Sequence, residues 1–350
     1  MSQPDMRRTD MQQPAQRQTG ARQAMRQPGG PLARGLLKLV APGGGGGGGL
    51  SILIYHRVRA QPDPLFPDEL VREEFDAHIA MLKSGFDVLP LIDAVRLARA
   101  GRLPPRAACI TFDDGYADNA EVALPVLQRH GVNATFFIAS GFLNGGRMWN
   151  DSVIEAVRGA AGDELDATAL GLGRHRLDTL ERRRLAIPAL LGQLKYRPPD
   201  ERAALVRALA ELSGAALPDD LMLTTAQLLR LRDAGMGIGA HTVSHPILAS
   251  LTPAQARAEM ADGRRALEQL LGMPVPLFAY PNGKPGTDYL AEHVEMARQI
   301  GFEGAVSTAW GGSRGRQDWH QLPRFTPWDR GRLRFLLRLA RNLTVAAAMA

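Results

Sequence analysis

Apolar runs and amphipathic stretches alternate along most of this chain. Seven short, mostly apolar runs predict strands, and the continuous ones suit strands buried on both faces. The seven runs are residues 50–55, 86–89, 106–112, 134–139, 236–240, 275–280 and 302–307. Between most of them, apolar residues recur with the period of a helix. The alternation therefore predicts a parallel sheet whose strands are joined by helices.

The predicted helix after residue 251 has the clearest start signal. Thr252 suits an N-cap, Pro253 the first helical position and Gln255 a capping box. The other predicted helices between strands are residues 75–83, 91–100, 119–130, 225–234 and 289–300. Seven repeats favour a barrel, open or closed, over a sandwich, so we expect an α/β fold. Functional groups in such barrels gather at the carboxyl ends of the strands.

One long segment departs from this repeat. Residues 141–220 are too many for a loop, and they carry helical periods at 180–194 and 200–213. We expect a helical insertion that lies over the strand ends.

The last part of the chain predicts a basic amphipathic helix at 330–350. Leu333, Leu336, Leu337 and Ala340 would share one face, with arginines on the other. Such a helix suits peripheral contact with an anionic membrane, or packing on the barrel with its arginines solvated. The basic N-terminal tail slightly favours the membrane.

The basic residues are concentrated in the two tails. Residues 1–49 hold seven basic and two acidic residues, and residues 330–350 hold five arginines and no acid. Since the whole chain carries +6, residues 50–329 carry −4. A nucleic-acid-binding core would present a basic face, so no nucleic acid partner is expected. We expect 1–49 to be a disordered tail ending in a poly-glycine linker, followed by a folded domain at 50–329.

The remaining composition limits the setting. Cys109 is the single cysteine, which excludes an internal disulfide and leaves nothing to indicate an oxidising compartment. No apolar run is long enough for a membrane span, and no basic and apolar leader opens the chain. We expect a monomer in the cytoplasm or peripheral at the inner membrane.

Two adjacent acids stand where a predicted buried strand ends. Asp113 and Asp114 precede Gly115 in the stretch Thr-Phe-Asp-Asp-Gly-Tyr. Side chains alternate along a strand, but a turning chain lets both carboxylates face one cleft. Two ionised carboxylates this close repel each other in a dry site, so a cation or a proton must lie between them. For the bare tripeptide, a solvated turn is an equal alternative.

A pair of histidines follows another strand end. His241 and His245 stand four residues apart, a spacing that metal sites use when the segment is helical. A lone histidine is more often structural, but two at a strand end favour a metal. With one carboxylate they would form a site suited to Zn²⁺ hydrolysis or Fe²⁺ oxygen chemistry.

Two further strand ends indicate little by themselves. Tyr280 and Asn282 belong to a Tyr-Pro-Asn-Gly sequence that reads as a turn, and His56 follows Tyr55 at the end of the first strand. Taken together, however, the four stretches resemble the polysaccharide deacetylases, the NodB-homology family of metal-dependent carbohydrate N-deacetylases.

The resemblance rests on two motifs matched without change and in the right order. Residues 111–115 match the family's TFDDG, and residues 241–246 match its HxxSHP. It covers about residues 50–328 and is closest to a subgroup that opens with a YH motif, here Tyr55-His56. Members of that subgroup act on exported or cell-surface polysaccharides, and the resemblance implies their fold, a distorted (β/α)7 barrel that is circularly permuted.

The resemblance implies a role for each matching residue. Asp113 would be the general base, and Asp114, His241 and His245 would hold a divalent metal. That metal would be Zn²⁺, with Ni²⁺, Co²⁺ or Fe²⁺ as alternatives. His56 would be the general acid, in place of the family's usual C-terminal histidine.

Some positions depart from the family pattern. Arg57 stands where unpermuted members commonly have an Asp, which leaves the partner that orients the acid open. The third motif normally has an Arg that tunes the base, but Ala279 stands near that position. Arg324 is our candidate for this guanidinium. His320 competes with His56 as the acid, although a surface loop residue is the plainer interpretation.

The implied activity is removal of N-acetyl groups from an amino-sugar polysaccharide or glycan of the envelope or exopolysaccharide type. Tyr280 and Asn282 would line the cleft, and Tyr116 and Trp149 would stack on sugar rings. An equal alternative makes Trp149 the anchor of the insertion's own core.

Three other functions compete with this one. The fold and metal would also suit a small cyclic amide or ureide as substrate, although the long insertion favours a polymer. A non-catalytic glycan-binding module and a non-haem iron oxygenase would both leave Asp113 without a task.

Overall fold

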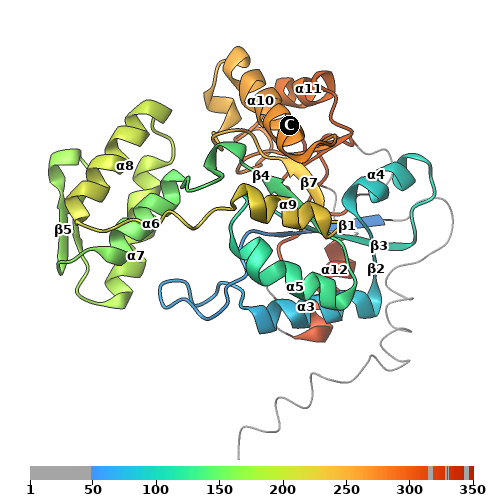
Figure 1. The fold of residues 1–350 in the computed structure, drawn as a ribbon, viewed down its shortest axis with the longest axis horizontal. Helices are drawn as coiled ribbons and strands as arrows, with labels where there is room; N and C mark the ends of the chain where they lie inside the picture. Colours follow the sequence, from blue (N-terminus) through green and yellow to red (C-terminus); the bar gives the residue numbers. More distant parts are fainter. Residues whose placement is uncertain (1–48, 314–317, 328, 330, 343–346) are drawn as a thin grey trace, which may run out of the picture.

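The computed structural model describes residues 49–313, 318–327, 329, 331–342 and 347–350. The predicted disordered tail and its linker lie outside these residues, except for Gly49, which opens the first strand. Figure 1 shows helices around a curled sheet, with a separate lobe beside them.

All seven predicted strands are present, and they form one parallel sheet. Its order is β1-β3-β4-β7-β8-β9, with β2 beside the start of β3. β1 pairs with β3 from Gly49↔Arg106 to Tyr55↔Phe112, so their carboxyl ends coincide. The strands are β1 (Gly49–Tyr55), β2 (Asp87–Val88), β3 (Arg106–Phe112), β4 (Thr135–Ile138), β7 (Gly237–Ala240), β8 (Leu277–Ala279) and β9 (Gly304–Val306).

An extended segment outside the named strands joins the two edges of the sheet. Residues 322–325 run parallel to β9 through the pair Leu322 and Val306, and parallel to β1 through the pair Phe325 and Leu53. The sheet is thereby closed into the predicted barrel.

Helices connect the strands on the outside of the barrel (Figure 1). The capping box predicted at the start of α10 is confirmed, because Thr252 and Gln255 each accept a bond from the other's backbone N–H. The π-helical turn η1 (Asn119–Ala123) precedes α5, and such wide turns often occur at functional sites. The α-helices around the barrel are α3 (Arg72–Gly85), α4 (Leu91–Arg99), α5 (Leu124–His130), α9 (Thr225–Asp233), α10 (Pro253–Leu271) and α11 (Ala291–Ile300). Short 3₁₀ turns are η2 (Ser140–Phe142), η3 (Thr168–Leu170) and η4 (Leu248–Ser250).

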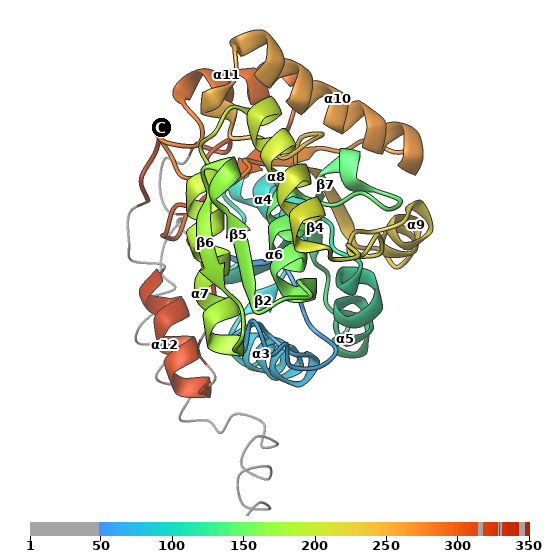
Figure 2. The same ribbon diagram turned by 90° about the vertical axis from the view of Figure 1, so that its left-hand side faces the viewer.

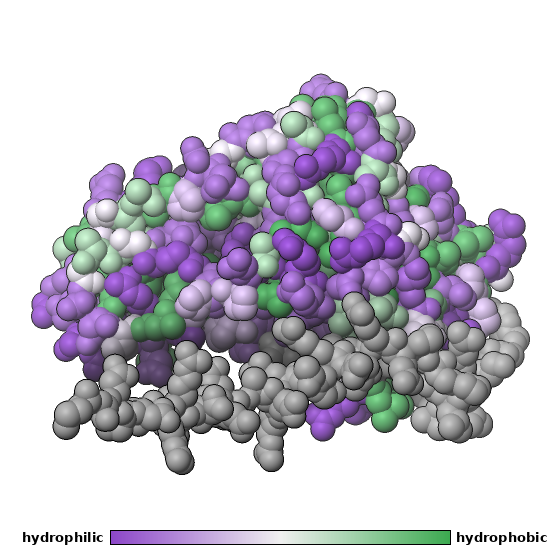
Figure 3. All heavy atoms as spheres, turned by 60° about the horizontal axis from the view of Figure 1, so that its bottom comes forward, coloured by the Kyte–Doolittle hydropathy of each residue, from purple (hydrophilic) through white to green (hydrophobic). Residues whose placement is uncertain are grey.

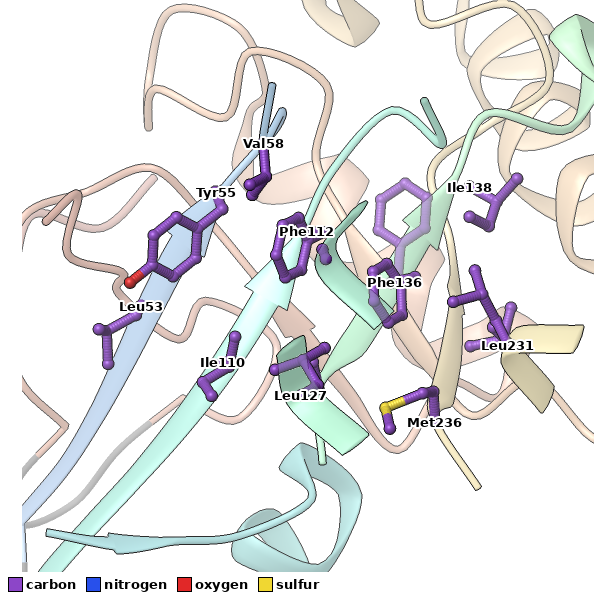
Figure 4. Packing of buried hydrophobic residues seen from close by; sticks show 14 of the residues in the cluster. Leu53, Tyr55, Val58, Ile110, Phe112, Leu127, Phe136, Ile138, Leu231 and Met236 are labelled. Atoms are coloured by element: carbon purple, nitrogen blue, oxygen red, sulfur yellow. The ribbon is translucent and has the colours of Figure 1, made fainter. Parts of the chain in front are cut away.

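Side chains along each strand alternate between the helix layer and the barrel interior. Phe112 and Phe136 belong to the outer cluster in Figure 4, where their rings stack with centroids 4.9 Å apart. Cys109 and Phe137 belong to a separate inner cluster. Since Asp113 is in phase with Cys109, the alternation directs its carboxylate into the barrel.

The predicted insertion forms the lobe on the left of Figure 1 and in front of the barrel in Figure 2. It has its own hydrophobic cluster, which includes Val153, Leu190 and Leu209. α7 and α8 match the two predicted helices, whereas the sequence periods did not single out the other elements. The lobe contains α6 (Trp149–Gly159), β5 (Glu164–Ala167), β6 (Gly173–Arg176), α7 (Leu180–Leu194) and α8 (Pro199–Ser213), with β5 and β6 antiparallel.

One residue ties the chain entering the lobe to the chain leaving it. Asn144 donates its backbone N–H to the Leu223 carbonyl at 3.1 Å. Its side chain exchanges hydrogen bonds with the backbone and hydroxyl of Thr225 at 2.8 and 2.9 Å. The lobe therefore leaves and rejoins the barrel at one place.

Helix α12 (Arg332–Asn342) packs beside α3 (Figure 1). Among its described residues, the buried side chains are the apolar ones of Phe335, Leu336 and Leu339 and the amide of Asn342. The prediction that Leu333, Leu336 and Leu337 share one apolar face is wrong. Leu333 and Leu337 are 61% and 40% exposed, whereas Leu336 is buried. The side chain of Ala340, the fourth residue of that face, lies outside the described part.

Figure 3 shows the underside of the molecule as a mainly hydrophilic surface with scattered hydrophobic groups among the described residues. Within the described ranges, the structure contains no helix with the length and apolar character needed to cross a bilayer.

Candidate active site

The carboxylate expected to act as base lies in a buried ion pair. Arg324 directs Nη1 and Nη2 at the two oxygens of Asp113, both at 2.6 Å. Nε of Arg324 donates to the Ser307 carbonyl at 2.9 Å, and the side chain is only 1% exposed. Burial raises the pKa of Asp113, but the charges of Arg324 and His241 outweigh it and hold that pKa below its ordinary value. Asp113 is therefore a fixed, ionised carboxylate.

Asp114, His241 and His245 form a cluster that fits a metal ion. Their ligand atoms all lie within 4.8 Å of one another. Oδ1 of Asp114 lies 3.4 Å from Nε2 of each histidine, yet it is buried and makes no hydrogen bond within the described part of the chain. A buried acceptor left without a partner costs free energy. One carboxylate and two imidazoles suit a divalent ion such as Zn²⁺, which would satisfy this oxygen.

The pKa values of these three groups differ in direction. Burial raises the pKa of Asp114, but contact with His241 and the charges of the nearby histidines bring it below its ordinary value. Burial lowers the pKa of His245 to about 4. For His241, burial also lowers the pKa, but Asp114 and Asp113 raise it above its ordinary value. The lowered pKa values of Asp114 and His245 leave both groups free to bind a metal at neutral pH, and at His241 a metal would compete with a proton.

The histidines meet across a tight turn. The helical geometry considered for this spacing is wrong: Thr242 and His245 have φ values of 66° and 54°, and the imidazole centroids are 4.8 Å apart. Asp114 also has a positive φ, of 77°. Each such residue costs on the order of 1–3 kcal/mol and persists where the surroundings enforce it, commonly at functional sites.

Two contacts outside the motifs hold this turn. Glu259 of α10 accepts hydrogen bonds from the backbone N–H groups of Val243 and Ser244, both at 2.9 Å, and from the Ser244 hydroxyl at 2.7 Å. His241 donates from Nδ1 to the Ala279 carbonyl at 2.7 Å, which leaves Nε2 for a metal. Sequence reasoning missed Glu259, since an acid on an amphipathic helix ordinarily reads as part of the solvated face.

His56 is exposed at the end of β1, close to the acid pair. Its charge is one of the causes that lower the pKa values of Asp113 and Asp114. A cavity of about 620 Å³ opens beside it, lined also by Asp68 and Glu69. His56 therefore lines this cavity and is also near enough to the two buried carboxylates to affect their pKa values.

His320, the alternative candidate for the general acid, does not lie at the end of the barrel that holds the acid pair. It is buried, and Nε2 donates to the Phe302 carbonyl at 2.9 Å, just before the start of β9. The acid pair and the histidine turn follow the carboxyl ends of strands, so His320 lies toward the opposite end of the barrel. Its description as a surface loop residue is also wrong.

Two aromatic residues expected to touch substrate are buried instead. Tyr280 is fully buried with its ring 3.9 Å from that of Tyr289, because Ala279 takes the inward position and the next side chain points to the helix layer. Tyr116 lies beneath the guanidinium of Arg57 at 4.3 Å, and its hydroxyl donates to Asp151 at 3.1 Å. Neither ring is open to stack on a sugar.

The other two substrate candidates take intermediate positions. Asn282 is half-buried in a turn with φ 58°. Trp149 packs against the core of the lobe, with Arg202 4.9 Å above its ring. Its position fits the alternative in which it anchors the insertion.

Trp310 is an exposed aromatic side chain that the sequence reasoning passed over. It follows the carboxyl end of β9, is 41% exposed, and stacks on Phe325, the residue after Arg324. The signal was available, since Trp310 stands three residues beyond the predicted strand 302–307.

Comparison with known proteins agrees with this arrangement. The family model described as "Polysaccharide deacetylase" matches residues 100–166 and 202–305. YxkH of Bacillus subtilis, named as a polysaccharide deacetylase, is 23% identical over 277 residues, which cover 79% of this chain and 70% of that protein.

Solved structures show the same fold. IcaB from Ammonifex degensii gives a TM-score of 0.55 at 19% identity, over 84% of this chain and 97% of that one. The Streptococcus pyogenes deacetylase PplD, in complex with acetate, gives 0.53 at 19% identity, over 79% and 92%. The two intact motifs, the barrel and these matches together show that the chain belongs to the polysaccharide deacetylase family.

Proposed function

We propose that this protein is a metal-dependent hydrolase that removes N-acetyl groups from an amino-sugar polysaccharide or glycan of the envelope or exopolysaccharide type. The observation that carries the proposal is the placement of Asp113 beside Asp114. Asp114 belongs to the metal-fitting cluster, whereas Asp113 is held away from it by Arg324. A site that only binds a glycan has no need of this second acid.

The proposed reaction divides its tasks among the residues of the site. A divalent ion held by Asp114, His241 and His245 would polarise the acetyl carbonyl and the attacking water, which an unreactive amide requires. Asp113 takes the proton from that water as it attacks the carbonyl carbon. Arg324 keeps the base ionised and directed into the barrel.

Cleavage of the amide needs a proton donor on the other side. His56 protonates the nitrogen, because an amine cannot leave as an anion at neutral pH. The C–N bond breaks, and acetate and a free amine remain. The backbone N–H of Tyr116 is suited to the developing oxyanion, since it donates to no backbone carbonyl within the described ranges.

We propose Zn²⁺ as the metal, with Ni²⁺, Co²⁺ and Fe²⁺ as alternatives, because a two-histidine, one-carboxylate donor set accepts each of them. For the substrate, Trp310 offers an exposed ring, and the cavity beside His56 offers room for a neighbouring sugar. PplD was solved with acetate, which is the acid that the proposed reaction would release.

A deacetylation assay tests the proposal. The purified protein is incubated with a soluble N-acetylglucosamine oligomer, and released acetate and free amines are counted. Activity that disappears with a chelator and returns with Zn²⁺ supports the proposal. Binding of the oligomer without acetate release would favour the glycan-binding alternative, and acetate release that is indifferent to chelator would exclude the metal.

We also propose that the protein acts as a monomer that touches anionic membranes through α12. The support is the outward side of that helix, where Leu333 and Leu337 are exposed and Arg334 and Arg341 are exposed beside them. Basic and apolar side chains on one helix surface suit an anionic bilayer.

A further inference from the structure

Three consecutive residues at the end of β1 are held by two residues that follow the acid motif. Asp118 accepts a hydrogen bond from Nε of Arg57 at 2.7 Å and from the backbone N–H of Val58 at 3.3 Å. Asn119 donates from Nδ2 to the carbonyl of His56 at 2.9 Å, and to Asp118 at 3.1 Å. Asp118 and Asn119 therefore hold one group of each residue: the carbonyl of His56, the guanidinium of Arg57 and the backbone N–H of Val58.

The contact is built into the interior. Asn119 is fully buried, and the side chains of Arg57 and Asp118 are 13% and 12% exposed. A buried ion pair is costly unless hydrogen bonds complete it, and here a backbone N–H and an amide do so. The π-helical turn η1 begins at Asn119, which places both residues at the barrel end where β1 and β3 finish.

We propose that Asp118 and Asn119 are positioning residues for His56. No hydrogen bond joins the His56 imidazole to another described residue, and its neighbour Arg57 is a cation that cannot accept an imidazole N–H. The direction of the ring is thus set through the backbone of residues 56–58. This inference rests on the proposed function, in which His56 donates the proton to the leaving nitrogen.

Arg57 stands at a position where an acidic residue could orient the His56 imidazole directly. Here Arg57 instead connects two loops of the site. Its guanidinium bonds Asp118 on one side and covers the Tyr116 ring at 4.3 Å on the other. The loop that bears the donor is thereby fastened to the loop that bears Asp113 and Asp114. Holding donor and base on one support matters, since small misplacements of reacting groups cost large factors in rate.

Hydrogen exchange tests the positioning without relying on activity. In Asp118→Ala, the amide of Val58 loses its acceptor, so we expect faster exchange at residues 57 and 58 and unchanged exchange in β3 and β4. Asp76→Asn is the control, because Asp76 also pairs with an arginine and a histidine but lies on the outer surface of α3. Unchanged exchange at residues 57 and 58 in Asp118→Ala would overturn the proposal.

A double-mutant cycle tests whether the effect reaches His56. Asp118→Ala and Asn119→Ala should each lower kcat by about 10- to 100-fold with KM nearly unchanged, as the loss of a supporting contact does. In a His56→Ala background the same substitutions should have little further effect, because residues that act through one group are not additive. Equal losses in both backgrounds would assign Asp118 a general structural role and overturn the proposal.

The two hypotheses fail in different ways. A wild-type protein that releases no acetate from any N-acetylated oligomer would remove the proposed function, and the exchange rates would still decide whether Asp118 holds residues 56–58. Wild-type activity with unaffected Asp118→Ala kinetics would leave the function standing and remove the positioning role. Asp118→Ala leaves the Arg57 guanidinium without its partner and should lower the melting temperature, so each variant is assayed well below its own melting temperature. Bound Zn²⁺ should match wild type in each variant, which separates positioning from loss of metal.

Discussion

Arg324 reaches Asp113 across 211 positions of the chain, and both arms of its guanidinium end 2.6 Å from the carboxylate oxygens. The arginine lies on the segment that joins β9 to β1, so the same stretch closes the barrel and holds the carboxylate that we propose as the base. A bidentate pair fixes the direction of a carboxylate as well as its charge.

Removing this arginine should move the acid limb of activity. The pKa of Asp113 is held below its ordinary value by Arg324, so Arg324→Met should raise it. A base must be ionised to act, and activity is lost as pH falls through its pKa. The acid limb of kcat/KM should therefore shift to higher pH in the variant, with a smaller shift in Arg324→Lys. An unmoved limb would show that Asp113 is not the group that titrates there.

Arg324→Met should also destabilise the fold, since a buried carboxylate left without its partner costs about 3–5 kcal/mol. The double variant Arg324→Met/Asp113→Asn should recover most of this loss, and urea denaturation measures both.

Asp113→Asn should keep the metal and lose the chemistry. Asp113 is not among the residues that fit the metal, and its amide replacement cannot take a proton. We expect kcat to fall by about 10²- to 10⁴-fold with bound Zn²⁺ at wild-type stoichiometry. Asp114→Asn is the matched comparison, because it should lose metal as well as activity. Full turnover in Asp113→Asn would end the proposed mechanism.

His56→Ala should likewise retain the metal while activity on an N-acetylated sugar falls. The loss should be smaller on an aryl acetate, whose leaving group departs without help from an acid. Bound Zn²⁺ and activity on both substrates are measured for the wild type and the variant. Loss of Zn²⁺ from this variant would make His56 a ligand and overturn its assignment as acid.

The stability of the metal-free protein should depend on Asp151. Burial raises the pKa of this carboxyl to about 7. In the unfolded chain it ionises near 3.9, so the native state binds its proton more tightly. Stability from this group is full below the unfolded pKa and is lost as pH rises toward 7, by roughly 4 kcal/mol.

Asp151→Asn should therefore flatten the fall in unfolding free energy between pH 4 and 8, measured by urea titration with a chelator present. Asp219→Asn, an exposed acid where the chain leaves the lobe, is the control and should follow wild type. A variant as pH-sensitive as wild type would place the titration elsewhere.

Membrane contact through α12 can be separated from packing by point substitution. Leu333→Asp with Leu337→Asp changes only the exposed side, and we expect weaker co-sedimentation with vesicles rich in anionic lipid and an unchanged melting temperature. Deleting residues 330–350 is less informative, because Phe335 and Leu339 belong to the core. Equal vesicle binding by wild type and variant would leave α12 a packing element.

Strand positions follow from the sequence because continuous apolar runs suit a sheet covered on both faces. The closing segment does not, since residues 322–325 are Leu-Pro-Arg-Phe and an arginine inside a barrel violates the pattern by which strands are recognised. Its charge is tolerated only because Asp113 meets it, and that partner is invisible at the level of one segment.

The metal-fitting residues were predictable because each follows a strand and stands in a recognisable motif. Glu259 and Asp118 were not, since each lies at or in a helix where an acid has an ordinary solvent-facing explanation. The prediction that Tyr280 lines the cleft was wrong for a different reason. The alternation that directs Ala279 inward sends the next side chain outward, so the two-residue period contained the answer.

Because the chain enters and leaves the lobe at Asn144, the lobe is a unit whose two ends lie together. A segment with its own core and neighbouring ends can be exchanged with little disturbance to the domain that receives it. If the lobe contacts the polymer in the proposed function, replacing the stretch between Asn144 and Leu223 would change the substrate without rebuilding the barrel. The incoming stretch would have to replace two contacts with the barrel domain: the partner of the Tyr116 hydroxyl beside the acids, and the pairing of Arg158 and Arg184 with Asp63 and Pro64.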